Sequence, residues 1–313
     1  MSSLLFPGQG SQIVGMGSEF YNNFDFVKKI FKEADDKLNY HISKIILEGP
    51  ENDLQLTKNT QPAILTVSYS IFKVMKEKFG FNLDEIQFLA GHSLGEYSAL
   101  VCSESLKFGD ALYLLHERGK FMQEAVPVGK GNMIAVLGSD LSTINDLLKS
   151  ISNEEGVCEI ANDNATGQII LSGDKNKVDL FKTILKKNNI KSIPLKVSAP
   201  FHCSLMKPAA EKMREKIDNV TFNKPIKNIV NNVTAQSESD PKKIKNLLVE
   251  QIYSTVRWRE SIINISDKGI KKYVEIGPGK ILTGMIKRTI KNSNCFSINT
   301  INEIENLTDE FKK

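Results

Sequence analysis

The stretch that decides the fold is Gln-Phe-Leu-Ala-Gly-His-Ser-Leu-Gly, residues 87–95. Residues 87–90 predict a strand, and Gly91-His92-Ser93-Leu94-Gly95 form a G-x-S-x-G pentapeptide ahead of a helical pattern. In such a strand-to-helix turn only glycines tolerate the crowding beside the serine, whose oxygen then points out at the sheet edge. The following amide, that of Leu94, lies at a helix N-terminus and can donate to an oxyanion. The stretch predicts an α/β fold with Ser93 as a candidate nucleophile, and an ordinary tight turn with a capping serine is the alternative.

Outward from this turn the chain alternates between strand and helix patterns, as an α/β domain requires. Strands are predicted at 3–6, 228–233 and 272–276, and helices at about 27–38, 60–79, 108–125 and 206–217, with a further helix opened by Asp240-Pro241. The helix at 60–79 is predicted to begin at a Thr60 cap. These segments assign residues 1–126 and 198–313 to one large α/β-hydrolase-like domain.

The middle of the chain has a different order of elements. Strands are predicted at 133–137, 157–161, 168–171 and 190–196, helices at 141–151 and around 178–185, and a turn-rich link at 162–167. The order β-α-β-β-α-β is that of a ferredoxin-like unit. We therefore predict an inserted subdomain at 127–197, with Gly129-Lys130-Gly131 and Ser198-Ala199-Pro200 as its hinges.

Composition excludes several classes of protein. The 313 residues carry 41 Lys and Arg against 37 Asp and Glu, and this net charge of +4 is too small to argue for a nucleic-acid partner. The four cysteines form no C-x-x-C pair and the four histidines no H-x-x-x-H pair, so neither a zinc ribbon nor a zincin site is expected. The scattered cysteines favour reduced thiols, so we expect a cytoplasmic protein. No signal peptide and no run of 18 apolar residues is found, so no membrane segment is expected.

A serine nucleophile needs a base, and the histidines are the candidates. His92 adjoins Ser93 and is expected to point away across the turn, His116 lies mid-helix, and His41 lies far upstream. His202 stands where the chain re-enters the large domain, in a loop of the kind that often carries catalytic groups. Because no acid is evident between Ser93 and His202, a dyad with the imidazole held by a backbone carbonyl is plausible. A capping or surface histidine is the alternative.

Arg118 is the third informative residue. It falls on one helical stripe with Ala111, Leu115 and Met122, and a guanidinium on an apolar face needs a buried anionic partner. That partner is either an internal Asp or Glu or, if it belongs to a substrate, a carboxylate that matches the guanidinium fork. Gly8-Gln9-Gly10 lacks the third glycine of a dinucleotide site, and close approach of backbone to a ligand is the better use of it.

Four motifs together resemble one known family. They are Phe6-Pro7-Gly8-Gln9-Gly10-Ser11-Gln12, Ala90-Gly91-His92-Ser93-Leu94-Gly95-Glu96-Tyr97, Arg118-Gly119-Lys120-Phe121-Met122-Gln123 and Val274-Glu275-Ile276-Gly277-Pro278-Gly279. In this order, along nearly the whole chain, they resemble the malonyl-CoA:acyl carrier protein transacylases. The resemblance implies an α/β-hydrolase-like domain with a ferredoxin-like insertion, as the patterns above predict.

The resemblance also implies roles for single residues. Ser93 matches the acylated nucleophile, His202 the general base and Arg118 the group that holds the malonyl carboxylate. Gln9 and Leu94 match the positions whose amides form the oxyanion hole, and Gln251 matches the residue whose carbonyl orients the histidine. Phe201, just before the histidine, resembles the phenylalanine found in the malonyl-preferring form of related polyketide acyltransferases. Ser254-Thr255 stands where many bacterial members have Asn-Pro, which leaves the shape of the loop after Gln251 open.

The implied reaction is a ping-pong transfer of malonyl from malonyl-CoA to the phosphopantetheine thiol of acyl carrier protein, in fatty acid synthesis. The resemblance implies no metal and no cofactor, an acidic and transient carrier-protein partner, and a monomer. A hydrolase with the same turn, a carrier-protein docking module and an excised polyketide synthase domain are the rival hypotheses. The position of Arg118 and the missing acid argue against the hydrolase.

Overall fold

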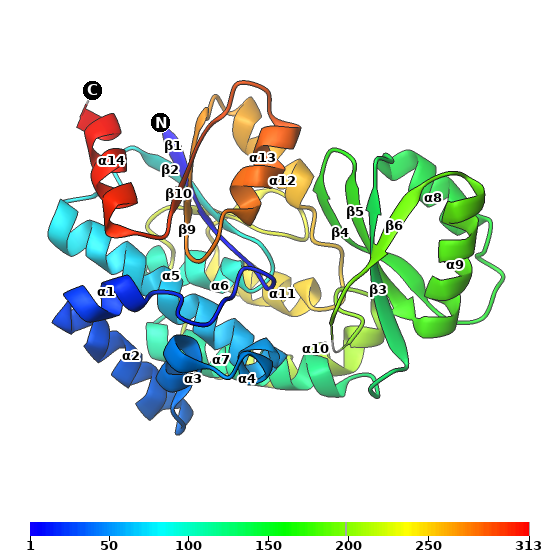
Figure 1. Cartoon of the computed structure of the whole chain (residues 1–313), viewed down its shortest axis with the longest axis horizontal. Coiled ribbons are helices and arrows are strands. Elements are labelled where there is room, and N and C mark those ends of the chain that lie inside the picture. Colours follow the sequence, from blue (N-terminus) through cyan, green and yellow to red (C-terminus); the bar gives the residue numbers. More distant parts are fainter. Residues whose placement is uncertain (198, 313) are drawn as a thin grey trace.

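The computed structural model describes residues 1–197 and 199–312, so Ser198 of the second expected hinge lies outside the described residues. It contains two sheets, one of six strands and one of four (Figure 1). The six-stranded sheet has the order β10-β9-β1-β2-β7-β8 and is parallel except for β8. Its strands are β1 (Ser2–Phe6), β2 (Ile86–Gly91), β7 (Asn228–Val230), β8 (Ser237–Glu238), β9 (Lys272–Ile276) and β10 (Asn294–Ile298).

Helices cover both faces of this sheet, as a parallel sheet requires. The helices of this part of the molecule are α1 (Ser18–Asn23), α2 (Asp25–Leu38), α3 (Ile42–Glu48), α4 (Glu51–Gln55), α5 (Thr57–Phe79), α6 (Gly95–Cys102), α7 (Phe108–Glu124), α10 (Lys207–Asp218), α11 (Pro241–Gln251), α12 (Trp258–Asp267), α13 (Ile281–Thr289) and α14 (Ile301–Lys312), with a 3₁₀ turn η1 (Ser204–Met206). The strand period of two divides the core: Leu4 packs with α5, α6 and α7, whereas Leu5 packs with α12 and α13.

The register of the central strands places two loops side by side. Phe6, the last residue of β1, pairs with Gly91, the last residue of β2, and the amide of His92 donates to the Phe6 carbonyl at 3.0 Å. The loop that follows β1 and the turn at Ser93 therefore leave the same carboxyl edge of the sheet. This edge is where parallel α/β sheets bind ligands.

The four-stranded sheet forms the second part of the molecule, at the opposite end from α14 (Figure 1). Its order is β4-β5-β3-β6, all neighbours are antiparallel, and it has its own apolar core with two helices. The elements are β3 (Gly131–Leu137), α8 (Leu141–Lys149), β4 (Cys158–Ala165), β5 (Gln168–Asp174), α9 (Lys175–Lys187) and β6 (Lys191–Pro194). The predicted fold class and the β-α-β-β-α-β order are confirmed, while the limits at 127 and 197 stay a prediction.

Two details of the sequence-based prediction are wrong. The polar residues 162–167 do not form a long turn, because β4 continues to Ala165. Its polar side is satisfied by the large domain: the Asp163 amide donates to the Val256 carbonyl at 3.0 Å and the Asp163 carboxylate pairs with Arg259 at 2.9 Å. The helix expected to begin at Thr60 begins at Thr57 instead, and the Thr60 hydroxyl donates to carbonyls of the preceding turn.

Candidate active site

Ser93 occupies the sharp turn between β2 and α6. Its φ of 53° lies in the left-handed region, which only a tightly constrained turn imposes on a serine. A Cβ on Gly91 would lie 1.8 Å from the Gly95 carbonyl carbon, and one on Gly95 would lie 2.2 Å from the Phe6 oxygen. Both glycines of the pentapeptide are thus required by space, in agreement with the crowding expected from the sequence.

Asn232 ties the two sides of this turn together. Its Oδ1 accepts from the Ser93 amide at 2.7 Å and its Nδ2 donates to the Gly91 carbonyl at 2.7 Å. Asn232 lies just beyond β7, the neighbour of β2, so the parallel sheet delivers it to the turn. The sequence analysis missed this residue, and the only signal was an asparagine pair at the end of a predicted strand.

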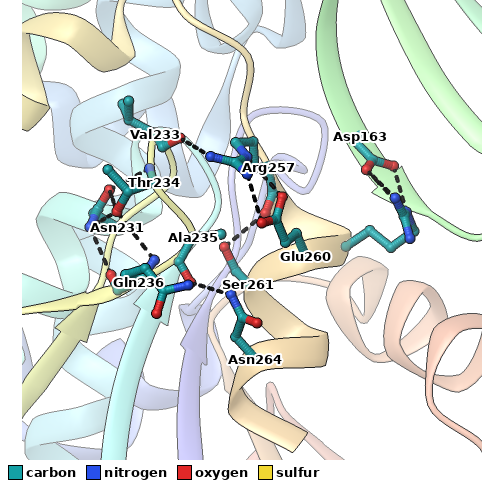
Figure 2. A network of polar contacts seen from close by, with 11 residues as sticks. Asp163, Asn231, Val233, Thr234, Ala235, Gln236, Arg257, Glu260, Ser261 and Asn264 are labelled. Atoms are coloured by element: carbon teal, nitrogen blue, oxygen red, sulfur yellow. Dashed lines mark hydrogen bonds and ion pairs between the residues drawn. The ribbon is translucent and has the colours of Figure 1, made fainter. Parts of the chain in front are cut away.

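The loop that carries Asn232 is braced by the start of α12 (Figure 2). The Arg257 guanidinium donates to the Val233 carbonyl at 3.2 Å and pairs with Glu260 at 2.6 Å. Further along, Asn264 Nδ2 donates to the Ala235 carbonyl at 3.0 Å. The same region contains the pair of Asp163 with Arg259, so the small subdomain, the Asn232 loop and α12 are held together by polar contacts.

His202 meets Ser93 from the other side of the site. Its Nε2 lies 2.8 Å from Ser93 Oγ and its Nδ1 lies 2.8 Å from the Gln251 carbonyl oxygen. Burial and the charge of Arg118 lower the pKa of His202 to about 3, so the imidazole is neutral at physiological pH. The structure therefore assembles a serine, a neutral histidine and a backbone carbonyl, although Ser254-Thr255 replaces the more common Asn-Pro just after Gln251.

The other histidines do not approach Ser93 Oγ in the same way. His92 Nε2 lies 2.8 Å from Asn164 Oδ1, and the His92 ring stands edge-on to Trp258. His116 Nδ1 lies 3.2 Å from the carbonyl of Lys58, the group that Pro62 inside α5 cannot bond. His41 is exposed at the start of α3.

Arg118 is buried beside Ser93, with 1 % of its surface exposed. Its Nη1 donates to Gln61 Oε1 at 2.8 Å, and its Nη2 donates to Gln251 Oε1 at 2.9 Å and to Ser93 Oγ at 3.1 Å. Among the described residues Arg118 has no carboxylate within ion-pair distance, and its Nε–H has no hydrogen-bond partner. Of the two partners considered from the sequence, the internal ion pair is therefore not found in the described structure.

A cavity of about 310 Å³ opens onto these groups. Ser93, His202 and Arg118 line it together with Gln9, Leu94 and Phe201, and side chains of α13 close its other side. The Gln9 and Leu94 amides donate to no group in the part of the chain that the structure describes. Five of the six residues predicted from the sequence thus line the cavity. The sixth, Gln251, lies outside the lining and contacts Arg118 through its side chain and His202 through its carbonyl.

Two more polar side chains near Arg118 escaped the sequence analysis. Gln61, inside α5, accepts a hydrogen bond from the Arg118 guanidinium. Glu96, in the first turn of α6, accepts from Gln251 Nε2 at 2.8 Å. Burial raises the pKa of Glu96 to about 7. Gln61 lies in a helix stretch whose neighbours are all buried, and Glu96 adjoins the pentapeptide, so only their place in the fold singles them out.

Neither a metal-binding cluster nor a membrane-spanning helix is found in the described residues. No cluster of three or more His, Cys, Asp or Glu side chains in residues 1–197 and 199–312 could hold a metal ion. No helix in the same residues is long and apolar enough to cross a membrane.

An elbow serine, a neutral histidine and two unused backbone amides around one cavity are the parts needed for acyl transfer through a covalent serine ester. Residues 4–311 match the family described as acyl transferase domain. The chain is 42 % identical over 304 residues to the malonyl CoA-acyl carrier protein transacylase of Bacillus subtilis, covering 97 % of this chain and 95 % of that protein. The fold and the site thus define an acyltransferase.

Solved structures agree with this class and narrow it. An acyl-carrier-protein-S-malonyltransferase from Bartonella henselae superposes with a TM-score of 0.96 at 40 % identity, covering 100 % of this chain and 99 % of that one. A malonyl-transacylase solved in complex with a type II PKS acyl-carrier protein superposes with a TM-score of 0.95 at 38 % identity, covering 99 % of each chain. The chain belongs to the malonyl CoA-acyl carrier protein transacylase family, which confirms the resemblance found in the sequence.

Proposed function

We propose that this chain transfers a malonyl group from malonyl-CoA to the phosphopantetheine thiol of acyl carrier protein through a malonyl ester on Ser93. The observation that carries the proposal is the buried guanidinium of Arg118, 3.1 Å from Ser93 Oγ and bonded to neutral side chains and to the Ser93 hydroxyl. A desolvated cation at this distance suits an acyl group that bears its own carboxylate, as malonyl does. An acetyl group offers nothing to it.

In the first half-reaction His202 Nε2 takes the proton of Ser93 Oγ while Oγ attacks the thioester carbonyl carbon. The Gln9 and Leu94 amides donate to the oxyanion that forms, which explains why neither amide is used within the described protein. When the C–S bond breaks, the sulfur of CoA leaves with the proton from His202. Malonyl remains on Ser93 Oγ, and its carboxylate stays on Arg118.

The second half-reaction reverses these roles. The thiol of the carrier-protein arm gives its proton to His202 Nε2, and its sulfur attacks the ester carbon. The C–O bond to Ser93 then breaks, and Ser93 Oγ recovers the proton from His202. The Gln251 carbonyl, 2.8 Å from Nδ1, holds the imidazole in one orientation through both halves. No step needs a metal or a redox cofactor.

The depressed pKa of His202 has burial as its largest cause and the charge of Arg118 as its second, with a smaller contribution from His92. A carboxylate bound to Arg118 offsets the second cause, because it places a negative charge next to the guanidinium. The imidazole then accepts the Ser93 proton more readily when a malonyl group is present than when an acetyl group is present.

The test of this function uses the unmodified protein. After incubation with malonyl-CoA, intact-mass measurement should show one added malonyl group, which disappears when holo acyl carrier protein is supplied and appears on the carrier. Release of free malonate instead would favour the rival hydrolase. Absence of any adduct would favour a docking module and contradict the proposal.

The His202→Ala variant tests the base. We expect single-turnover acylation by malonyl-CoA to slow by at least about 10²-fold, the low end of what a general base contributes. The folded state should survive, because the variant removes two hydrogen bonds and leaves no buried charge behind. A nearly normal rate would move the base elsewhere, and a larger loss in His92→Ala would assign it to His92.

Four finer points belong to the same proposal. The cytoplasm is the expected location, in line with four free cysteines in the described structure. A monomer is the expected state. The acidic, transient character of the carrier-protein contact and the place of the reaction in fatty acid synthesis are part of the proposal as well.

A further inference from the structure

A second buried charge lies one side chain away from Arg118. Glu96, with 1 % of its surface exposed, accepts from Gln251 Nε2 at 2.8 Å and from the Asn232 amide at 3.1 Å. At the other end of the same side chain, Gln251 Oε1 accepts from Arg118 Nη2 at 2.9 Å. The amide of Gln251 therefore joins a carboxylate to a guanidinium, with its nitrogen toward the anion and its oxygen toward the cation.

The orientation of this amide is fixed by its surroundings. Besides Glu96, Gln251 Nε2 faces the Ser93 carbonyl oxygen and Asn232 Oδ1, each at 3.1 Å. Turning the amide over would place its oxygen against three oxygen atoms and its nitrogen against the Arg118 donor. The bridge between the two charges is thus a fixed dipole, which both charges polarise in the same sense.

A carboxylate in direct contact with Arg118 would occupy the guanidinium fork and compete with a substrate carboxylate. A carboxylate held one amide away offsets part of the cost of burying the cation and leaves to the substrate the guanidinium hydrogens that have no protein partner, the Nε–H among them. We propose that Glu96 is a positioning residue that acts through Gln251 as the remote counter-charge of Arg118, and that it limits how tightly the site holds malonyl. The inference rests on the function proposed above.

The sign of the effect follows from the charges. With Glu96 ionised, the pair of Glu96 and Arg118 is neutral, and a malonyl carboxylate brings the site to a net charge of −1. With Glu96 neutral, the same carboxylate cancels a net charge of +1. The Glu96 charge therefore weakens ground-state binding of malonyl, which favours turnover, because a malonyl ester held too tightly would resist the acceptor thiol.

Glu96 can change its charge in the physiological range. Burial raises its pKa to about 7, while hydrogen bonds from Asn232 and Gln251 and the charge of Arg118 act in the opposite direction. The titratable groups that interact with it are Arg118 on α7 and Tyr97 on α6, and Tyr97, with its pKa raised to about 12, stays neutral. His202 interacts electrostatically with His92 and with Arg118.

Binding of a carboxylate at Arg118 must raise the pKa of Glu96 further, and by reciprocity protonation of Glu96 must tighten binding of the carboxylate. Malonyl-CoA should therefore bind more weakly as the pH rises through about 7. Near that pH, binding of malonyl-CoA should also be accompanied by uptake of a fraction of a proton by Glu96. Acetyl-CoA carries the same CoA phosphates and lacks the carboxylate. The difference between the two esters therefore excludes any contribution from titration of CoA itself.

The experiment measures binding without reaction, in a Ser93→Ala background. Calorimetric titration with malonyl-CoA and acetyl-CoA at pH 6, 7 and 8, in buffers of different ionisation enthalpy, gives both affinity and proton uptake. Adding Glu96→Gln should tighten malonyl-CoA about tenfold at pH 8, within the usual range of coupled sites, leave acetyl-CoA unchanged and abolish the proton uptake. The glutamine oxygen can still accept from Gln251 and Asn232.

Glu275→Gln in the same background is the matched control. Glu275 is also a buried carboxylate that accepts two hydrogen bonds, from the Leu282 and Thr283 amides at 3.1 and 2.8 Å, but it is not bridged to Arg118. It should leave the preference for malonyl-CoA over acetyl-CoA unchanged.

Two results would overturn the inference. One is equal weakening of both CoA esters by Glu96→Gln, which would make Glu96 a purely structural residue. The other is binding of malonyl-CoA to the Ser93→Ala protein with no more pH dependence and no more proton uptake than binding of acetyl-CoA. This second result does not depend on the folding of the Glu96 variant. If the wild-type protein took no malonyl at all, the proposed function itself would fail.

Discussion

Replacing Ser93 by alanine should abolish the malonyl-enzyme and leave the fold intact. The hydroxyl is the only group that the variant removes, and its neighbours, His202 Nε2 and Arg118 Nη2, lose one contact each. Arg118 keeps its hydrogen bonds to Gln61 and Gln251, so no buried charge is left bare. The left-handed φ of 53° is imposed by the turn, and alanine carries the same Cβ as serine at that position.

The measurement is intact mass after incubation with malonyl-CoA, alongside thermal unfolding of both proteins. Wild type should gain one malonyl group, and Ser93→Ala should gain none, with a similar melting temperature. A variant that still gains malonyl on another residue would show that Ser93 is not the nucleophile. A variant that has unfolded would decide nothing, and retained binding of malonyl-CoA is the control for that case.

The parts of the site that could be predicted from the sequence are those written in contiguous residues. The turn at Ser93 is local, because Gly91 and Gly95 are demanded by contacts within the turn and with the end of β1. Arg118 stood out because a charge on an apolar helical stripe is costly wherever the helix packs. The six-residue set was completed by the resemblance, since Gln251 holds His202 through its backbone carbonyl, which any residue carries, and its side chain meets Arg118 only across a long span of sequence.

The parts that could not be predicted are contacts between distant segments. Asn232 reaches the Ser93 amide across 139 residues of sequence, and Glu96 meets Gln251 across 155, so neither contact leaves a periodicity behind. The strand at Cys158–Ala165 was cut short in the prediction for a related reason. Its polar end is satisfied by Val256 and Arg259 of the other domain, and local composition cannot show a partner that far away.

Replacing Arg118 by alanine should change which acyl group the protein accepts. Malonate supplies the charge that the guanidinium lacks in the described structure, and acetate does not. Losing a desolvated, charge-assisted contact should cost malonyl transfer about 2–5 kcal/mol, as for other buried pairs that lose one partner. Acetyl transfer should fall little or even rise, because the pocket no longer holds a cation that lacks a carboxylate in direct contact.

The test compares kcat/KM for malonyl-CoA and acetyl-CoA on wild type, Arg118→Ala and Arg118→Lys. Lysine keeps the charge but not the planar fork, so Arg118→Lys should retain part of the malonyl preference. It thereby separates the need for a charge from the need for two parallel donors. In Arg118→Ala the side chains of Gln61 and Gln251 lose the donor that Arg118 supplied. In Arg118→Lys they lose it only if the lysine does not reach them, and thermal unfolding reports that loss. Equal losses on both CoA esters would mean that Arg118 serves the fold, and its role as the carboxylate clamp would be abandoned.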